Sequence, residues 1–152
     1  MTSAEPSSAA TPYDNALCTA LTTEHGVIYG YGMVSAHCQP DVNGLVSSAL
    51  NQHRLRRDQV IAMLAGRSVS APVAAAGYQL PMPINNPTDA VRLAVRMEKD
   101  SEVAWRAVIE QAQSPQDREF SVTALTQSAV LAARWKQALG DWPITTAFPG
   151  GD

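Results

Sequence analysis

Apolar residues recur at steps of three and four over four long stretches of the chain, the spacing that places them on one face of an α-helix. The first stretch begins at Thr11-Pro12, a capping residue followed by proline, and runs to about Cys38. Gln39-Pro40 then ends it. We therefore expect a long first helix that starts at residue 12.

The second stretch follows a capping residue, Asp41, and ends at Gly66, which we expect to adopt the left-handed conformation that closes a helix. Its steps of four and three predict an inward face of Val42, Val46, Leu50, His53, Arg57, Val60 and Leu64.

The third and fourth stretches each begin with a capping residue and proline, at Asn86-Pro87 and Ser114-Pro115. The predicted inward face of the third helix is Val91, Ala94, Glu98, Trp105 and Ile109. That of the fourth helix, which we expect to end before Gly140, is Val122, Leu125, Ala129, Ala132 and Leu139.

The lengths of the connections predict the topology. Two or three residues separate the first helix from the second and the third from the fourth, so each pair should be antiparallel. About twenty residues with three prolines lie between Gly66 and Asn86, enough to travel the roughly 36 Å of a 24-residue helix. We expect an all-α four-helix bundle with one long crossover between its second and third helices.

A chain of 152 residues has room for one domain. We expect a disordered segment at residues 1–11, the bundle at residues 12–140, and a C-terminal tail at residues 141–152 that is packed on the bundle or disordered. Because exposed Trp and Phe are uncommon, Trp142 and Phe148 favour a tail laid over the helices.

Charge and cysteine content bear on partners and location. A net charge of −3 with 16% charged residues gives no basic field for nucleic acid or anionic lipid, and no apolar run reaches the length of a membrane span. Cys18 and Cys38 lie on one predicted helix roughly 30 Å apart, too far for a disulfide. Two reduced thiols and the absence of a secretory signal indicate a cytoplasmic protein.

Three ionisable residues fall at one depth of the predicted bundle. Glu24, His53 and Glu98 come from three different helices and agree in level to roughly 3 Å. The matching level of the fourth helix carries Thr126, Gln127 and Ser128, none of which is a good iron ligand.

The chain resembles the ferritin-like superfamily, and more closely an uncharacterised bacterial ferritin-like family. The segments that carry the resemblance, over about residues 12–140, are Glu24-His25-Gly-Val-Ile-Tyr29-Gly-Tyr31-Gly, His53-Arg54-Leu-Arg56-Arg57-Asp58, Gly77-Tyr78-Gln-Leu-Pro81 and Glu98. In di-iron members two helices each supply a Glu and two supply Glu-x-x-His.

By this resemblance Glu24 and Glu98 match the single glutamates and His53 matches one histidine. Leu50 occupies the position where the glutamate of that Glu-x-x-His is expected, and the second Glu-x-x-His has no counterpart. The resemblance thus implies a degenerate di-iron site.

One hypothesis is a metal-free polar core. Arg57 lies one turn beyond His53, as Glu102 lies one turn beyond Glu98, and a guanidinium can neutralise a buried carboxylate without titrating near neutral pH. The expected polar core cluster is Glu24, His53, Arg57, Glu98, Glu102 and Tyr78. On this hypothesis the protein is a non-enzymatic structural or binding module without a cofactor, and a homodimer.

Two alternatives stay open. Glu24, His53 and Glu98 could hold one iron or manganese ion that activates dioxygen or peroxide, with Tyr31 or Tyr78 beside it. A small-molecule pocket beneath the crossover around Tyr78 is the third possibility.

Overall fold

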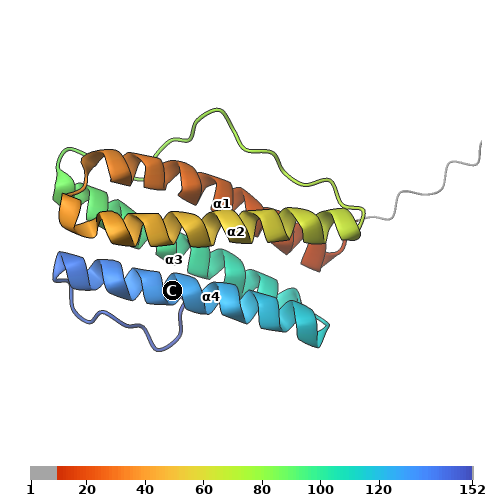
Figure 1. Cartoon of the computed structure of the whole chain (residues 1–152). Helices are drawn as coiled ribbons and strands as arrows, with labels where there is room; N and C mark the ends of the chain where they lie inside the picture. Colours follow the sequence, from red (N-terminus) through yellow and green to blue (C-terminus); the bar gives the residue numbers. More distant parts are fainter. Residues whose placement is uncertain (1–9, 152) are drawn as a thin grey trace, which may run out of the picture.

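The computed structural model describes residues 10–151 of the chain, so most of the segment expected to be disordered, residues 1–11, lies outside the described residues. Thr11 belongs to the described part, as the N-cap of the first helix. The helices are α1 (Pro12–His37), α2 (Asn43–Gly66), α3 (Pro87–Gln111) and α4 (Pro115–Leu139), with a short 3-10 turn, η1 (Pro40–Val42), ahead of α2. The four long helices lie alongside one another, and the described residues contain no strand (Figure 1). The prediction of an all-α four-helix bundle is confirmed.

Local signals start and end most helices where the sequence predicts. The side chains of Thr11, Asn86 and Ser114 each accept a hydrogen bond from the backbone N–H three residues further on, which is the geometry of an N-cap. Gly140 ends α4 with a φ of 75°. These caps satisfy backbone groups that the helices themselves leave unpaired.

The end of α2 differs from the prediction. Gly66 is its last helical residue, and the left-handed conformation belongs instead to Ser68, with a φ of 58°. The buried face of α2 also differs, because Ala49 and Arg56 are buried where Leu50 and Arg57 were expected. Its buried residues are Val46, Ala49, His53, Arg56, Val60 and Leu64.

The predicted inward face of α4 is largely wrong. Val122 is 48% exposed, and Ala132 is the only predicted inward residue of this helix that is buried. The buried residues of α4 are Ser121, Ala124, Ser128, Leu131, Ala132 and Trp135. Apolar residues lie on more than one side of this helix, so the spacing of apolar residues alone did not decide which face is buried. The large side chains of Leu131 and Trp135 are the ones that fill the core.

The long crossover is present. Residues 67–86 run along the outside of α1, from the end of α2 to the start of α3, so that α2 and α3 point the same way (Figure 1). α1 packs against α2 and α3, and α3 packs against α4. α2 and α4 approach each other less closely than these pairs do.

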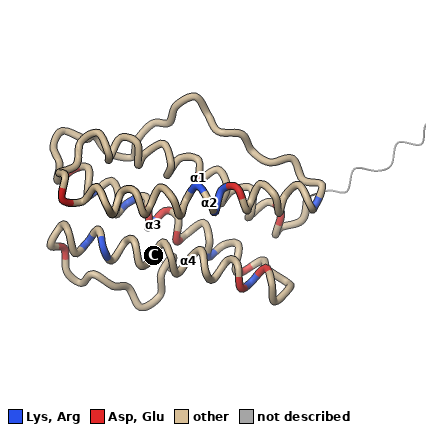
Figure 2. The backbone as a smooth tube through the Cα atoms, viewed as in Figure 1, with Lys and Arg blue, Asp and Glu red and all other residues tan. Residues whose placement is uncertain are grey.

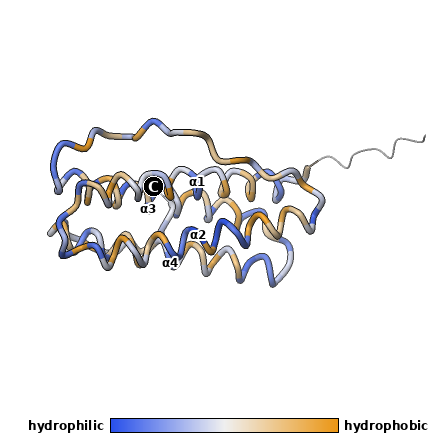
Figure 3. The backbone as a smooth tube through the Cα atoms, turned by 45° about the horizontal axis from the view of Figure 1, so that its top comes forward, coloured by the Kyte–Doolittle hydropathy of each residue, from blue (hydrophilic) through white to orange (hydrophobic). Residues whose placement is uncertain are grey.

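A hydrogen bond and a ring contact hold the crossover against α1. It contains no Lys, Arg, Asp or Glu from residue 68 to residue 86 (Figure 2), and it lies on the side of the bundle away from α4 (Figure 3). The His25 ring hydrogen-bonds the carbonyl of Pro72 at 3.1 Å, and the rings of Tyr29 and Tyr78 lie 5.5 Å apart. Tyr78 therefore lies outside α1, and its expected place in the polar core is wrong.

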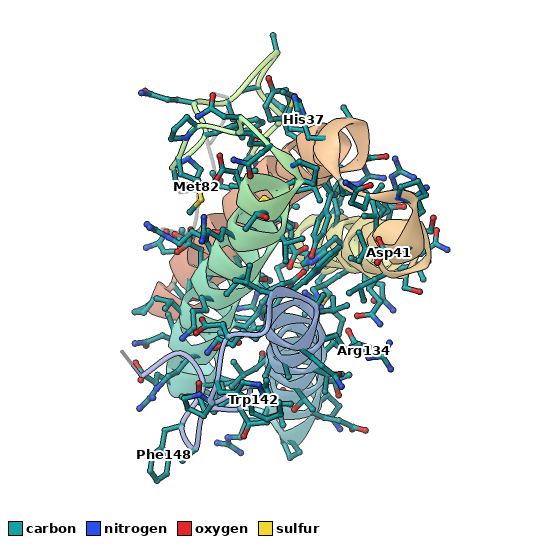
Figure 4. The ribbon with its side chains drawn as sticks, turned by 90° about the vertical axis from the view of Figure 1, so that its left-hand side faces the viewer. His37, Asp41, Met82, Arg134, Trp142 and Phe148 are labelled. Atoms are coloured by element: carbon teal, nitrogen blue, oxygen red, sulfur yellow. The ribbon has the colours of Figure 1, made fainter. Side chains whose placement is uncertain are left out.

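The C-terminal tail returns to α3 through its backbone. The Glu102 carboxylate accepts a hydrogen bond from the N–H of Gly150, whose φ is 76°. A Cβ at this position would collide with the carbonyl of Glu102, so the approach requires glycine. Trp142 and Phe148 are 71% and 78% exposed (Figure 4), which corrects the expectation that their rings cover the helices.

No helix among the described residues combines the length and apolarity required to cross a lipid bilayer. Cys18 and Cys38 are both free thiols.

Candidate functional site

A layer of polar residues divides the interior of the bundle into two apolar clusters. Leu17, Leu64 and Trp105 belong to one cluster, and Leu93 and Trp135 to the other. The layer between them, which we call the buried charge layer, comprises Glu24 from α1, His53 and Arg56 from α2, Glu98 and Ser101 from α3, and Ser128 from α4. Each of these residues is at most 2% exposed.

His53 lies between two carboxylates. Its Nδ1 is 2.6 Å from Oε2 of Glu24, and its Nε2 is 2.9 Å from Oε1 of Glu98. Since an ionised carboxylate can only accept, both ring nitrogens must donate, and the ring is an imidazolium. Burial alone would lower the pKa of His53, but the charge of Glu98 and the hydrogen bonds to both carboxylates raise it to about 9.

Arg56 is the second cation of the layer. Its Nη1 donates to Oε1 of Glu24 at 3.0 Å and to Oγ of Ser128 at 3.1 Å, while Nη2 donates to Oε1 of Gln127 at 2.8 Å. Two cations thus face two carboxylates, and the buried charge layer is neutral overall. Neutrality matters because an uncompensated ion in the interior costs several kcal/mol.

Glu24 is held in its charged form from several sides. Its Oε1 also accepts from Nε1 of Trp105 at 2.8 Å and from Oγ of Ser101 at 3.5 Å. Burial tends to raise the pKa of Glu24, but the hydrogen bond and charge of His53, together with the charge of Arg56, hold it below its usual value. Both cations of the layer, His53 and Arg56, therefore pair with Glu24.

Glu98 continues the hydrogen-bonded chain into the second apolar cluster. Its Oε1 accepts from the Tyr31 hydroxyl, whose oxygen accepts from Nε1 of Trp135 at 2.8 Å. Burial and the neighbouring Glu98 carboxylate raise the pKa of Tyr31 well above its usual value, so the hydroxyl keeps its proton and acts as a donor. Oε2 of Glu98 is buried and has no hydrogen-bond partner among residues 10–151.

The structure brings together Glu24, His53 and Glu98, as their matching depths predicted. It does not place Arg57 with them. Arg57 donates to Asp58 at 2.8 Å and is partly exposed, with 29% of its side chain accessible, whereas Arg56 enters the layer. Helical steps of three and four also connect the residues of the face that is buried, namely Val46, Ala49, His53, Arg56 and Val60. The small side chain of Ala49 was a sign that this face points inward.

Glu102 is buried but does not pair with Arg57. It lies under the C-terminal tail, and burial raises the pKa of its carboxyl group. By contrast, Gln127 and Ser128 lie at the level predicted for the fourth helix, where they contact Arg56. The sequence did not predict that the indole N–H groups of Trp105 and Trp135 donate to the polar network. The available signal was that a Trp buried in a core needs an acceptor for its N–H.

The layer does not fit a single ion bound jointly by Glu24, His53 and Glu98. The two carboxylates lie at different edges of the imidazole ring, one at each nitrogen, so one ion cannot contact both of them and a ring nitrogen. A metal-bound imidazole must also be neutral, with one nitrogen free of its proton. In residues 10–151, no group of three or more His, Cys, Asp and Glu side chains has a geometry that could hold a metal ion.

Raising the pH should weaken the fold through His53. In the unfolded chain its imidazole loses its proton near pH 6.5, whereas in the folded protein it keeps it to about 9. The stabilisation is therefore complete below pH 6.5 and is lost as the pH rises to 9, by about 3 kcal/mol. The free energy of unfolding in urea should be measured for the wild type and for His53→Gln across this pH interval. The difference between the two should decline as the pH rises, and a constant difference would contradict the prediction.

Removing the buried guanidinium should cost far more than removing its neighbour. Arg56→Met leaves Glu24 short of a partner, and we expect a loss of about 3–5 kcal/mol in the free energy of unfolding. The matched control, Arg57→Met, changes a surface side chain and should stay within about 0.5 kcal/mol. Arg56→Lys keeps the charge and should fall between them. Denaturant unfolding of the three variants measures this, and equal losses at positions 56 and 57 would refute the assignment.

Comparison with known proteins places the chain in a family. Its residues 16–152 match the model of the domain of unknown function DUF4439. The crystal structure of a conserved hypothetical protein, rv2844, from Mycobacterium tuberculosis is similar, with 61% identity and a TM-score of 0.84 over 91% of this chain and 97% of that one. No curated protein matches. The chain therefore belongs to the DUF4439 family.

Proposed function

We propose that this protein is a non-enzymatic structural or binding module of ferritin-like type, with a metal-free polar core where a di-iron centre has been lost. The observation that supports this most is the position of His53, which donates from one nitrogen to Glu24 and from the other to Glu98. Together with Arg56, this imidazolium neutralises the same two carboxylates that would otherwise require a metal ion.

The burial of the layer also argues against catalysis there. A general acid or base must come within hydrogen-bonding reach of its substrate. Glu24, His53 and Glu98 are each 0% exposed, and both nitrogens of His53 are engaged by carboxylates. A substrate would have to displace one of these charge-assisted bonds and open the helices before it could meet a reactive group.

A structural role follows from the same contacts. Apolar side chains tolerate small shifts of one helix along another, but hydrogen bonds between ions require matched positions. His53 links α2 to α1 and α3, and Arg56 links α2 to α1 and α4. The layer would thus fix the height of all four helices relative to one another.

The second candidate function is a mononuclear iron or manganese enzyme. One feature favours it, namely that Oε2 of Glu98 is buried and unpaired among the described residues. An ion at this oxygen would have to recruit His53 in its neutral form, and Glu24 would then lose a hydrogen-bond donor. The cost of that rearrangement makes this the weaker proposal.

Metal analysis separates the two candidates. After anaerobic incubation with ferrous iron or Mn²⁺ near neutral pH and removal of unbound ions, we expect far less than one ion per chain. Glu98→Gln should change this value no more than the surface control Glu110→Gln does. One ion per chain that is retained in the control and lost in Glu98→Gln would overturn the metal-free proposal in favour of the enzyme.

We also propose that the protein is a homodimer, since bundles of this kind commonly extend their apolar faces across a two-fold contact. Leu55 on α2 is 65% exposed, and Val103 on α3 and Val130 on α4 are each 48% exposed, so candidates for such a contact are available. Sedimentation velocity should give the mass of two chains, and a single-chain mass at all concentrations would contradict this. Location in the cytoplasm stays a prediction.

A further inference from the structure

A groove runs between α2 and α4, the two neighbouring helices that pack least closely. Its volume is about 400 Å³, and its lining includes Arg56 from α2 and Glu119, Phe120, Thr123 and Gln127 from α4. The groove adjoins the buried charge layer, because Arg56 and Gln127 belong to the lining and are hydrogen-bonded to each other.

Arg56 brings an unused donor to this groove. Its side chain is almost completely buried, and its Nε has no hydrogen-bond acceptor among residues 10–151. Nε and Nη2 lie on one edge of the rigid guanidinium, and Nη2 donates to Oε1 of Gln127. An N–H donor and a carbonyl oxygen therefore lie next to each other on two side chains that line the groove.

A second unpaired atom lies one turn earlier on the same helix. Oε1 of Gln52 is buried and has no partner within the described chain. Leaving a buried polar atom unpaired costs about 1–3 kcal/mol, so a ligand that pairs with such atoms gains more than it would at a solvated surface. Gln52 does not line the groove, so the unpaired Nε of Arg56, which does line it, is the atom that favours a polar ligand over a purely apolar one.

The charges around the groove favour an uncharged ligand. The two cations and two carboxylates of the buried charge layer already balance, so a bound carboxylate would leave an excess negative charge beside Glu119 in the lining. A bound cation would face the guanidinium of Arg56. Phe120 adds an apolar wall, with its ring 5.6 Å from that of Trp105.

We propose that the α2–α4 groove binds a small, uncharged aromatic carboxamide. The carbonyl oxygen accepts from Nε of Arg56, the amide N–H donates to Oε1 of Gln127, and the ring packs on Phe120. A carboxamide matches this pattern because it presents one acceptor and one donor side by side. The inference rests on the proposed role as a binding module and names the ligand class, and it is independent of how much metal the protein binds.

Titration with benzamide, followed by NMR of the arginine Nε and tryptophan indole resonances, tests the proposal. We expect saturable shifts of Arg56 Nε and of the Trp105 indole, with a Kd on the order of 1 mM for a fragment of this size. Benzoate should bind at least about tenfold more weakly, because its charge is unfavourable beside Glu119. Equal or tighter binding of benzoate would overturn the proposal and indicate an anion site.

A matched pair of variants locates the binding. Thr123 lines the groove but does not belong to the buried charge layer, so Thr123→Trp fills the groove without replacing a residue of that layer and should abolish the shifts. Val122→Trp adds the same side chain at an exposed neighbouring position outside the lining and should leave them unchanged. The proposal is refuted if the shifts survive Thr123→Trp or if the wild type shows no saturable shifts. It is also refuted if the resonances move with protein concentration alone, because a second copy would then cover the groove. Metal analysis of the same samples reports separately on the metal-free core.

Discussion

The bundle depends on one interaction, the imidazolium of His53 held between the carboxylates of Glu24 and Glu98. Two carboxylates cannot stay ionised in an apolar interior unless cations and hydrogen-bond donors compensate for the lost water. His53 supplies one cation and Arg56 the other, both from α2. This helix consequently has to present its polar face inward at that level, which fixes how it docks on the other three.

The buried charge layer also explains the division of the core. Apolar residues fill both ends of the bundle, and each end contributes one tryptophan whose indole N–H reaches the chain of hydrogen bonds, Trp105 through Glu24 and Trp135 through Tyr31. The two apolar clusters are thus tied to the layer by directional bonds as well as by packing. Arg56 extends this chain to Gln127 in the α2–α4 groove, so the buried charge layer and the proposed ligand site share one side chain.

The chain belongs to the DUF4439 family. What distinguishes this interior from a metal centre is chemical. A metal ligand needs a free lone pair on the imidazole, whereas His53 uses both nitrogens as donors. The residue types alone therefore do not separate the two chemistries, and the hydrogen-bond partners of these three side chains decide between them.

The amino-acid sequence by itself determined the four helices, their starts at Thr11, Asn86 and Ser114, and the long crossover, because caps, prolines and loop lengths act locally. It also determined that Glu24, His53 and Glu98 share one level, since the rise of a helix is fixed.

Only the tertiary structure decided which arginine meets them, which face of α4 is buried, and that Trp142 and Phe148 stay exposed. A rotation of about 100° separates Arg56 from Arg57, and choosing between them depends on how neighbouring helices pack, for which the local sequence carries too little information.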